Sequence, residues 1–122
     1  MAVSLDGRRF AAPGQAPGGE VDADTVFEYH EDGDMVWARY AGGAVRLGYL
    51  VGVRRDDAID FRYSQLNTCG ETSSGFCRST VEVLADGRVR LHETWRWESR
   101  PGEGTSIVEE VPRDPYHKVL DA

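Results

Sequence analysis

Short turn-forming motifs recur along the whole chain at intervals too short for long packed helices. Gly next to Asp or Gly marks turns at 6–7, 31–34, 42–43 and 86–87, and similar clusters lie at 54–57, 67–71 and 100–104. The segments between them are rich in Val, Thr, Tyr, Phe and Trp, and none keeps an apolar period of 3.6 residues. This pattern is typical of short strands joined by tight turns, so we expect an all-β protein.

Eight strands are expected, and nearly all of them follow one another as hairpins. The expected ranges are 9–12, 25–30, 35–40, 45–53, 59–66, 75–84, 89–98 and 105–111. A sheet of this kind must cover its apolar face, and sequential hairpins favour closure. We therefore predict a single antiparallel up-and-down β-barrel, calycin-like, whose interior is either packed or open for one small ligand.

One domain, 1–122, is expected, with a core barrel at 9–111 and a tail at 112–122 that receives no role. The segment at 13–22 is too rich in Pro and Gly for a helix, so it is expected to be a loop over one end of the barrel. A chain of 122 residues normally builds a single core.

The charge of the chain restricts its partners. The formal net charge of −7 argues against nucleic acid and against an anionic membrane surface, because both bind through surplus Lys and Arg. No apolar run has the length of a signal peptide or a membrane span, so a cytoplasmic location is expected.

The cysteines and histidines do not form a recognisable site. Cys69 and Cys77 flank a hairpin tip, and in a reducing compartment we expect two free thiols, although pairing stays open. The three histidines are scattered, and no zinc-ligand spacing is present. The sequence therefore predicts neither a metal nor a cofactor.

Alternation along the strands assigns side chains to the interior. The odd positions from Val45 to Val53 are all apolar or aromatic, which places Tyr49 inside and leaves two glycines on the opposite face. In the next strand Phe61 and Tyr63 share an interior face. The two strands together predict one buried aromatic side.

The run LHETWRWES places a carboxylate on an apolar face. Glu93 shares that face with Leu91, Trp95 and Trp97. A buried carboxylate is unfavourable unless it is paired or hydrogen-bonded. Glu93 is therefore the sharpest candidate for a site, and it predicts an interior partner.

At least one interior arginine is expected beside Glu93, with Tyr63, Gln65 and Thr80 as further available partners. Arg39 and Arg78 each lie at the centre of a strand, although alternation leaves the face of both open. The orientation of Glu109 is also open. If its side chain faces inward, it forms a carboxylate pair with Glu93, and if its strand is an exposed edge strand, no pair forms.

Four interpretations of Glu93 remain open. It belongs to a buried network that sets strand register, it anchors a ligand, it acts as a general acid or base with Tyr63 as the alternative proton-moving group, or it lies outside the barrel through a register error. The tryptophans are likewise either core or binding platform.

A resemblance extends over roughly residues 6–111. Its segments are VFEYHEDGDMVWARYAGGAVRLGYLVG, DFRYSQLN, GFCRSTVEVLADGRVRLHETWRW and GTSIVEE. In these segments the chain resembles a family of short bacterial proteins carried under the label N-acetylglutamate synthase. The resemblance implies acyl transfer from acetyl-CoA, but it implies no particular catalytic residues.

The leading expectation is a small-molecule binding barrel for a small apolar or aromatic ligand. The alternatives are a barrel enzyme that moves a proton, as a cyclase or isomerase does, the acyltransferase, and a packed domain that acts through its surface, for example as a homodimer. The expected pocket residues are Glu93, Trp95, Trp97, Tyr63, Phe61, Tyr49, Arg39 and Arg78.

Overall fold

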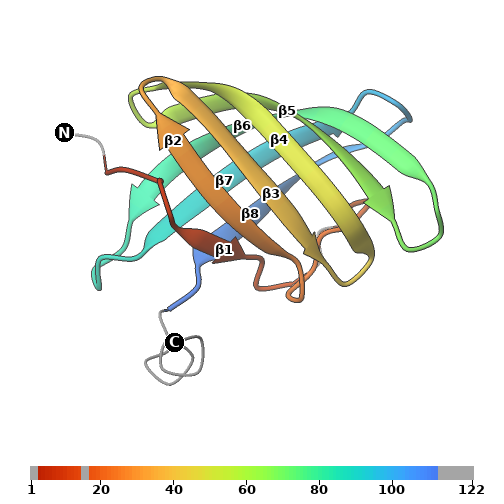
Figure 1. Ribbon diagram of the computed structural model, residues 1–122, viewed down its shortest axis with the longest axis horizontal. Helices are drawn as coiled ribbons and strands as arrows, with labels where there is room; N and C mark the ends of the chain where they lie inside the picture. The colour runs from red at the N-terminus through yellow and green to blue at the C-terminus, as the bar shows by residue number, and fades with distance from the viewer. Residues whose placement is uncertain (1–2, 15–16, 113–122) are drawn as a thin grey trace.

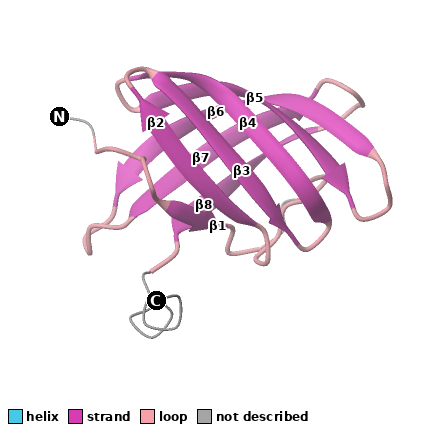
Figure 2. Ribbon diagram, viewed as in Figure 1, coloured by secondary structure: helices cyan, strands magenta, loops and turns pink. Residues whose placement is uncertain are grey.

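The protein is built from strands alone within the part of the chain that the structure describes. The computed structural model describes residues 3–14 and 17–112. Figure 2 shows strands joined by loops, and these described residues contain no helix that could cross a membrane. The strands are β1 (Arg9–Ala11), β2 (Val26–Asp32), β3 (Met35–Gly42), β4 (Val45–Arg55), β5 (Ala58–Asn67), β6 (Thr72–Val83), β7 (Val89–Trp97) and β8 (Glu103–Glu110).

The eight strands form one closed antiparallel barrel in chain order (Figure 1). Every strand pairs with its neighbours in sequence, and β1 closes the barrel on β8 through the pair Phe10 and Glu110. The all-β, up-and-down barrel expected from the sequence is confirmed. Observed strand boundaries differ from the expected ones by three residues at most.

Tight turns connect the strands because glycine occupies the positions that require positive φ. Gly33 in the β2–β3 turn has a φ of 62°, and Gly43 in the β3–β4 turn has a φ of 61°. Residues with a Cβ rarely adopt this conformation, whereas it suits the right-handed twist of hairpins. The turn motifs thereby determine which strands become neighbours.

One end of the barrel is sealed by the N-terminal segment, which enters at the left in Figure 1. Leu5 is fully buried there, and its backbone N–H donates to Glu31 at 2.8 Å. The guanidinium of Arg54 donates to the carbonyl oxygen of Val3 at 2.7 Å and to Glu31 at 3.1 Å. We call this the closed end.

An apolar core fills the barrel between the closed end and its middle. Its members come from six strands and the N-terminal segment, and each of them is at most 1% exposed. They include Leu5, Phe10, Val36, Ile59, Val89, Leu91 and Val108. The interior toward the opposite end is not filled in this way.

The expected face of β4 is wrong beyond its first residue. A bulge between Val45 and Leu47 shifts the alternation, so Gly48 and Leu50 face the interior while Tyr49 is 55% exposed. A shift of one residue exchanges the two faces of a strand completely. The apolar side chains that the alternation placed inside, such as Val51, lie on the outer surface.

Candidate functional site

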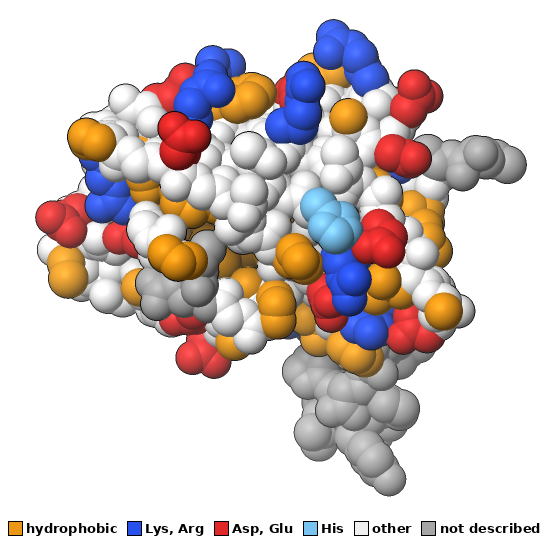
Figure 3. Space-filling view, turned by 180° about the vertical axis from the view of Figure 1, so that it is seen from behind, with side chains coloured by type: hydrophobic (Ala, Val, Ile, Leu, Met, Phe, Trp, Pro, Cys, Tyr) orange, Lys and Arg blue, Asp and Glu red, His pale blue; other side chains and the backbone are white. Residues whose placement is uncertain are grey.

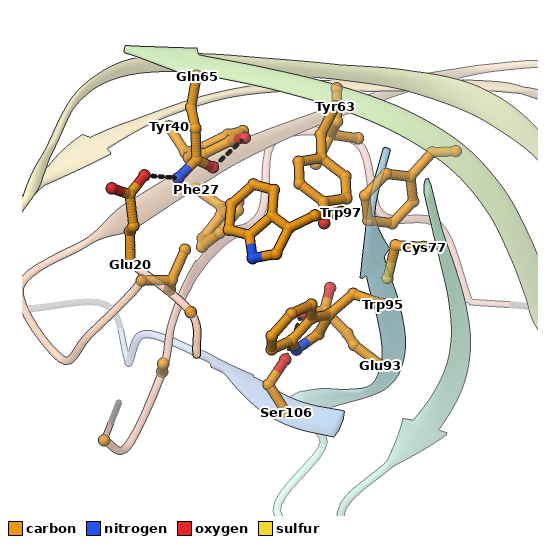
Figure 4. A pocket seen from close by; sticks show the side chains of 16 residues that line it. Glu20, Phe27, Tyr40, Tyr63, Gln65, Cys77, Glu93, Trp95, Trp97 and Ser106 are labelled. Atoms are coloured by element: carbon orange, nitrogen blue, oxygen red, sulfur yellow. Dashed lines mark hydrogen bonds between the residues drawn. The ribbon is translucent and has the colours of Figure 1, made fainter. Parts of the chain in front are cut away.

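A cavity opens between the core and the end opposite the closed end. It has a volume of about 70 Å³. A single water molecule needs about 10–15 Å³ on this measure, so the cavity has room for several waters or a small organic group. Its walls include Phe27 on β2, Phe61 on β5, and Trp95 and Trp97 on β7 (Figure 4). The interior is therefore open in the half of the barrel that lies away from the closed end.

Four of the aromatic residues around the cavity lie against glycines of neighbouring strands. A Cβ at any of these glycines would collide with the ring or with the backbone next to it. Glycine inside a strand often marks such a close approach. The four cross-strand pairs are Tyr40 with Gly48, Phe61 with Gly52, Tyr63 with Gly75 and Trp95 with Gly104.

Glu93 lies at the floor of the cavity. It is 9% exposed, and the Ser106 hydroxyl on β8 donates to its Oε1 at 3.1 Å. Burial raises the pKa of the Glu93 carboxyl from 4.5 to about 7, and the Ser106 hydrogen bond opposes this rise. Desolvation is the larger effect, so the carboxyl changes charge near neutral pH.

Two further polar groups lie buried at the depth of Glu93. Ser79 is its cross-strand neighbour on β6 and is fully buried. The Ser79 Oγ and the hydroxyl of Tyr29 have no hydrogen-bond partner among the described residues. Burial raises the pKa of Tyr29, and the negative charge of Glu93 adds to the rise. This level of the barrel therefore holds unused hydrogen-bonding capacity.

The mouth of the cavity is covered by residues 17–25 of the β1–β2 connection, which we call the mouth loop. The carboxylate of Glu20 accepts from Gln65 and from Asn67, each at 2.8 Å. The Tyr40 hydroxyl donates to the side-chain amide oxygen of Gln65 at 2.9 Å (Figure 4). The indole N–H of Trp97 donates to the Gly18 carbonyl oxygen at 3.1 Å. The loop expected at one end of the barrel is present and lies against the walls of the cavity.

The two arginines proposed as partners of Glu93 lie outside the barrel. Arg39 is exposed, and Arg78 forms a bidentate pair with Asp60 at 2.6 and 2.7 Å on the outer surface. Acidic and basic side chains are interspersed on the face shown in Figure 3. The expectation of an arginine beside Glu93 is wrong, because Arg54, the buried arginine among the described residues, pairs with Glu31 at the closed end.

The prediction that Tyr49 lines the pocket is also wrong, because its side chain faces solvent on β4. The ring of Tyr63 does line the cavity, but its hydroxyl donates to the Arg96 carbonyl oxygen at 3.3 Å.

Glu109 does not pair with Glu93. It lies against Arg90 at 2.7 Å, so the carboxylate pair considered for the interior does not form.

The structure adds residues that alternation did not identify. Tyr40, Glu20 and Ser106 all line the cavity. Glycines within strands were the available signal for Tyr40 and Trp95, since a missing Cβ indicates a large neighbour. No local signal existed for Glu20, because its partners lie 45 and 47 residues away in sequence.

Cys69 and Cys77 do not form a disulfide bond with each other. Cys69 is exposed in the β5–β6 turn, whereas Cys77 is buried and lines the cavity. Burial, followed by the charge of Glu93, raises the pKa of the Cys77 thiol well above its ordinary range. The expectation of free thiols is confirmed. No group of three potential metal ligands occurs among residues 3–14 and 17–112.

Substitution of Gly104 tests the packing of Trp95. A Cβ at this position would lie 2.7 Å from Cζ2 of the indole, so Gly104→Ala must displace the ring. We expect an altered near-ultraviolet circular dichroism spectrum and a loss of about 1–3 kcal/mol in the free energy of unfolding. Thr105→Ala, on the exposed face of the same strand, is the matched control and should leave both unchanged. An unchanged spectrum in Gly104→Ala would contradict this packing.

Comparison with known proteins places this barrel in a family. The model of a family described as avidin-like proteins matches residues 3–111. No curated protein and no solved structure gave a significant match. The match covers all eight strands, and a calycin-type barrel is the fold that the sequence predicted. The chain therefore belongs to the avidin-like protein family.

Proposed function

We propose that this barrel is a binding protein for a small molecule, held between Trp95, Trp97, Tyr63 and Phe61 above Glu93. The cavity carries the proposal, since it combines an apolar wall with a single buried carboxyl at its floor. Small-molecule sites typically have this composition. The family supports the proposal, because avidin-like barrels are known for binding small molecules such as biotin.

The arrangement of the mouth supports the same function. Gln65 is 4% exposed and Asn67 is 5% exposed, and both direct their amide groups to Glu20 of the mouth loop. A purely structural barrel would gain stability from filling the space beneath this loop, because empty volume forfeits packing contacts. The loop instead covers an open interior, which suits a site that shields its ligand from water.

Tryptophan fluorescence provides the test. Trp95 and Trp97 line the cavity, and a Trp37→Phe background removes the emission of the third tryptophan, which lies outside it. The panel contains 2-phenylethanol, phenethylamine, 3-phenylpropionate and biotin, together with acetyl-CoA as the substrate implied by the acyltransferase resemblance. We expect a saturable change in emission with at least one small aromatic compound.

The same titration in Gly104→Ala separates cavity binding from surface binding. Displacement of Trp95 should weaken binding about tenfold or more, whereas Thr105→Ala should retain the affinity of the parent protein. Absence of a saturable signal from every compound, with no ligand retained in a native mass spectrum of protein from its own host, would contradict the proposed function.

A further inference from the structure

The walls of the cavity carry charge of one sign. Glu20 at the mouth and Glu93 at the floor are its charged members, and no Lys, Arg or His belongs to the described lining. The two carboxylates differ in their surroundings. Glu20 accepts from two amides and lies 3.9 Å from the guanidinium of Arg100 at the rim, so its charge is already compensated.

Glu93 has no such compensation. Its described side-chain hydrogen bond comes from the Ser106 hydroxyl and reaches Oε1, which leaves Oε2 for the cavity. The inward guanidinium of Arg54 binds Glu31 and the Val3 carbonyl at the closed end. A carboxylate in this position is 91% buried without a cation beside it. Such a group is strongly unfavourable in its charged form unless something positive enters the site.

Aromatic rings surround the space above this carboxylate. Ring faces carry partial negative charge and attract ammonium and guanidinium groups, most strongly when the cation is removed from water. Six rings line the cavity, contributed by β2, β3, β5 and β7. They are Phe27, Tyr40, Phe61, Tyr63, Trp95 and Trp97. This arrangement of rings and one acid is complementary to a cationic group.

We propose that the ligand of this site is an organic cation, a primary amine or a similar nitrogen base on a small apolar body, with its charged group on Glu93 and its body among the aromatic rings. This inference rests on the proposed function. It adds the charge of the ligand, which the fold and the cavity volume leave undetermined.

The other titratable groups near Glu93 remain neutral at physiological pH. They are Tyr29 on β2, Tyr40 on β3, Tyr63 on β5 and Cys77 on β6, and burial raises the pKa of each. The elements that complete the surroundings contribute Phe10 on β1, Leu50 on β4 and Ser106 on β8. Glu93 is thus the group whose titration should control binding of a cation.

Phenethylamine and 2-phenylethanol form the test pair, since they share one apolar body and differ in charge. 3-Phenylpropionate supplies the opposite charge. At pH 8 we expect the amine to bind at least tenfold more tightly than the alcohol, and the anion more weakly than both. At pH 5.5 the amine should lose about tenfold or more in affinity, because protonation of Glu93 then opposes binding, while the amine itself stays charged.

Glu93→Gln keeps the shape of the side chain and removes its charge. In this variant the amine should bind no better than the alcohol at either pH. Glu103→Gln, on the exposed face of β8, removes one surface charge and is the matched control, which should keep the preference for the amine.

The outcomes separate this inference from the proposed function. Equal or tighter binding of the alcohol or the anion would overturn the cationic ligand and leave the binding function intact. Retention of the preference for the amine in Glu93→Gln would overturn the role of Glu93. Failure of all three compounds and of the rest of the fluorescence panel, with no ligand retained in the native mass spectrum, would overturn the proposed function itself.

Discussion

At pH 8 the Glu93→Gln variant is expected to be more stable than the parent protein by about 3 kcal/mol in the free energy of unfolding. Burial raises the pKa of Glu93 from 4.5 to about 7, so ionisation is less favourable in the folded state than in the unfolded state. The parent protein must therefore lose stability as the pH rises from about 4.5 to about 7, and the loss is complete above pH 7. Glutamine stays neutral and avoids it.

Urea denaturation between pH 4.5 and pH 8.5 measures this difference. The two proteins should have nearly equal stability at pH 4.5 and diverge as the pH rises, since at the acid end the glutamic acid is neutral in the folded state and only about half ionised in the unfolded state. Glu103→Gln controls for the change in net charge and should follow the parent profile. Parallel profiles for the parent and Glu93→Gln would show that Glu93 is not desolvated as the structure indicates.

Replacement of Arg54 by alanine is expected to reduce the free energy of unfolding by about 3 kcal/mol. The side chain of Arg54 is 5% exposed, and that of its partner Glu31 is 14% exposed. Loss of the guanidinium removes the cation beside the Glu31 carboxylate, which then keeps the hydrogen bond from the Leu5 N–H. The Val3 carbonyl oxygen loses the hydrogen bond from Arg54. An ion pair of this kind is costly to break from one side, because the remaining charge stays buried.

Arg55→Ala is the matched control for Arg54→Ala. Arg55 is the next residue of β4, but it faces solvent, and its removal should change stability by about 0.5 kcal/mol or less. Thermal or urea unfolding of both variants at pH 7 provides the comparison. A loss below about 1 kcal/mol in Arg54→Ala would show that the N-terminal segment does not depend on this ion pair for its position.

Glu31 and Glu93 both direct a carboxylate toward the interior, but the two groups have different partners. Glu31 has a permanent cation within the protein, and it contributes to sealing the closed end. Glu93 has a hydroxyl as its described partner and faces a cavity, so its charged form lowers stability at neutral pH. Groups that destabilise the folded protein while facing a cavity are frequent at functional sites. This contrast is the physical basis for assigning the ligand to the Glu93 end of the barrel.

Alternation along β7 was sufficient to place Glu93, Trp95 and Trp97 inside the barrel. Side chains alternate strictly along a regular strand, and no bulge interrupts β7. The same reasoning succeeded for Phe61 on β5 and failed for Tyr49 on β4. The bulge near Val45 is a local irregularity that the apolar pattern does not encode. The glycines at 48 and 52 were an overlooked signal, because Gly48 lies against the ring of Tyr40 on β3 and Gly52 lies against the backbone of β5.

By itself, the sequence determined the architecture. Turn motifs and period-two alternation are local properties, and short hairpins in succession leave closure as the way to cover the apolar face and remove the sheet edges. The partner of Glu93 was decided only by the tertiary structure. Ser106 lies 13 residues away on the next strand, and both candidate arginines face solvent. Contacts of this kind depend on strand register and barrel closure, which bring together groups whose spacing in the sequence carries no information about their distance in space.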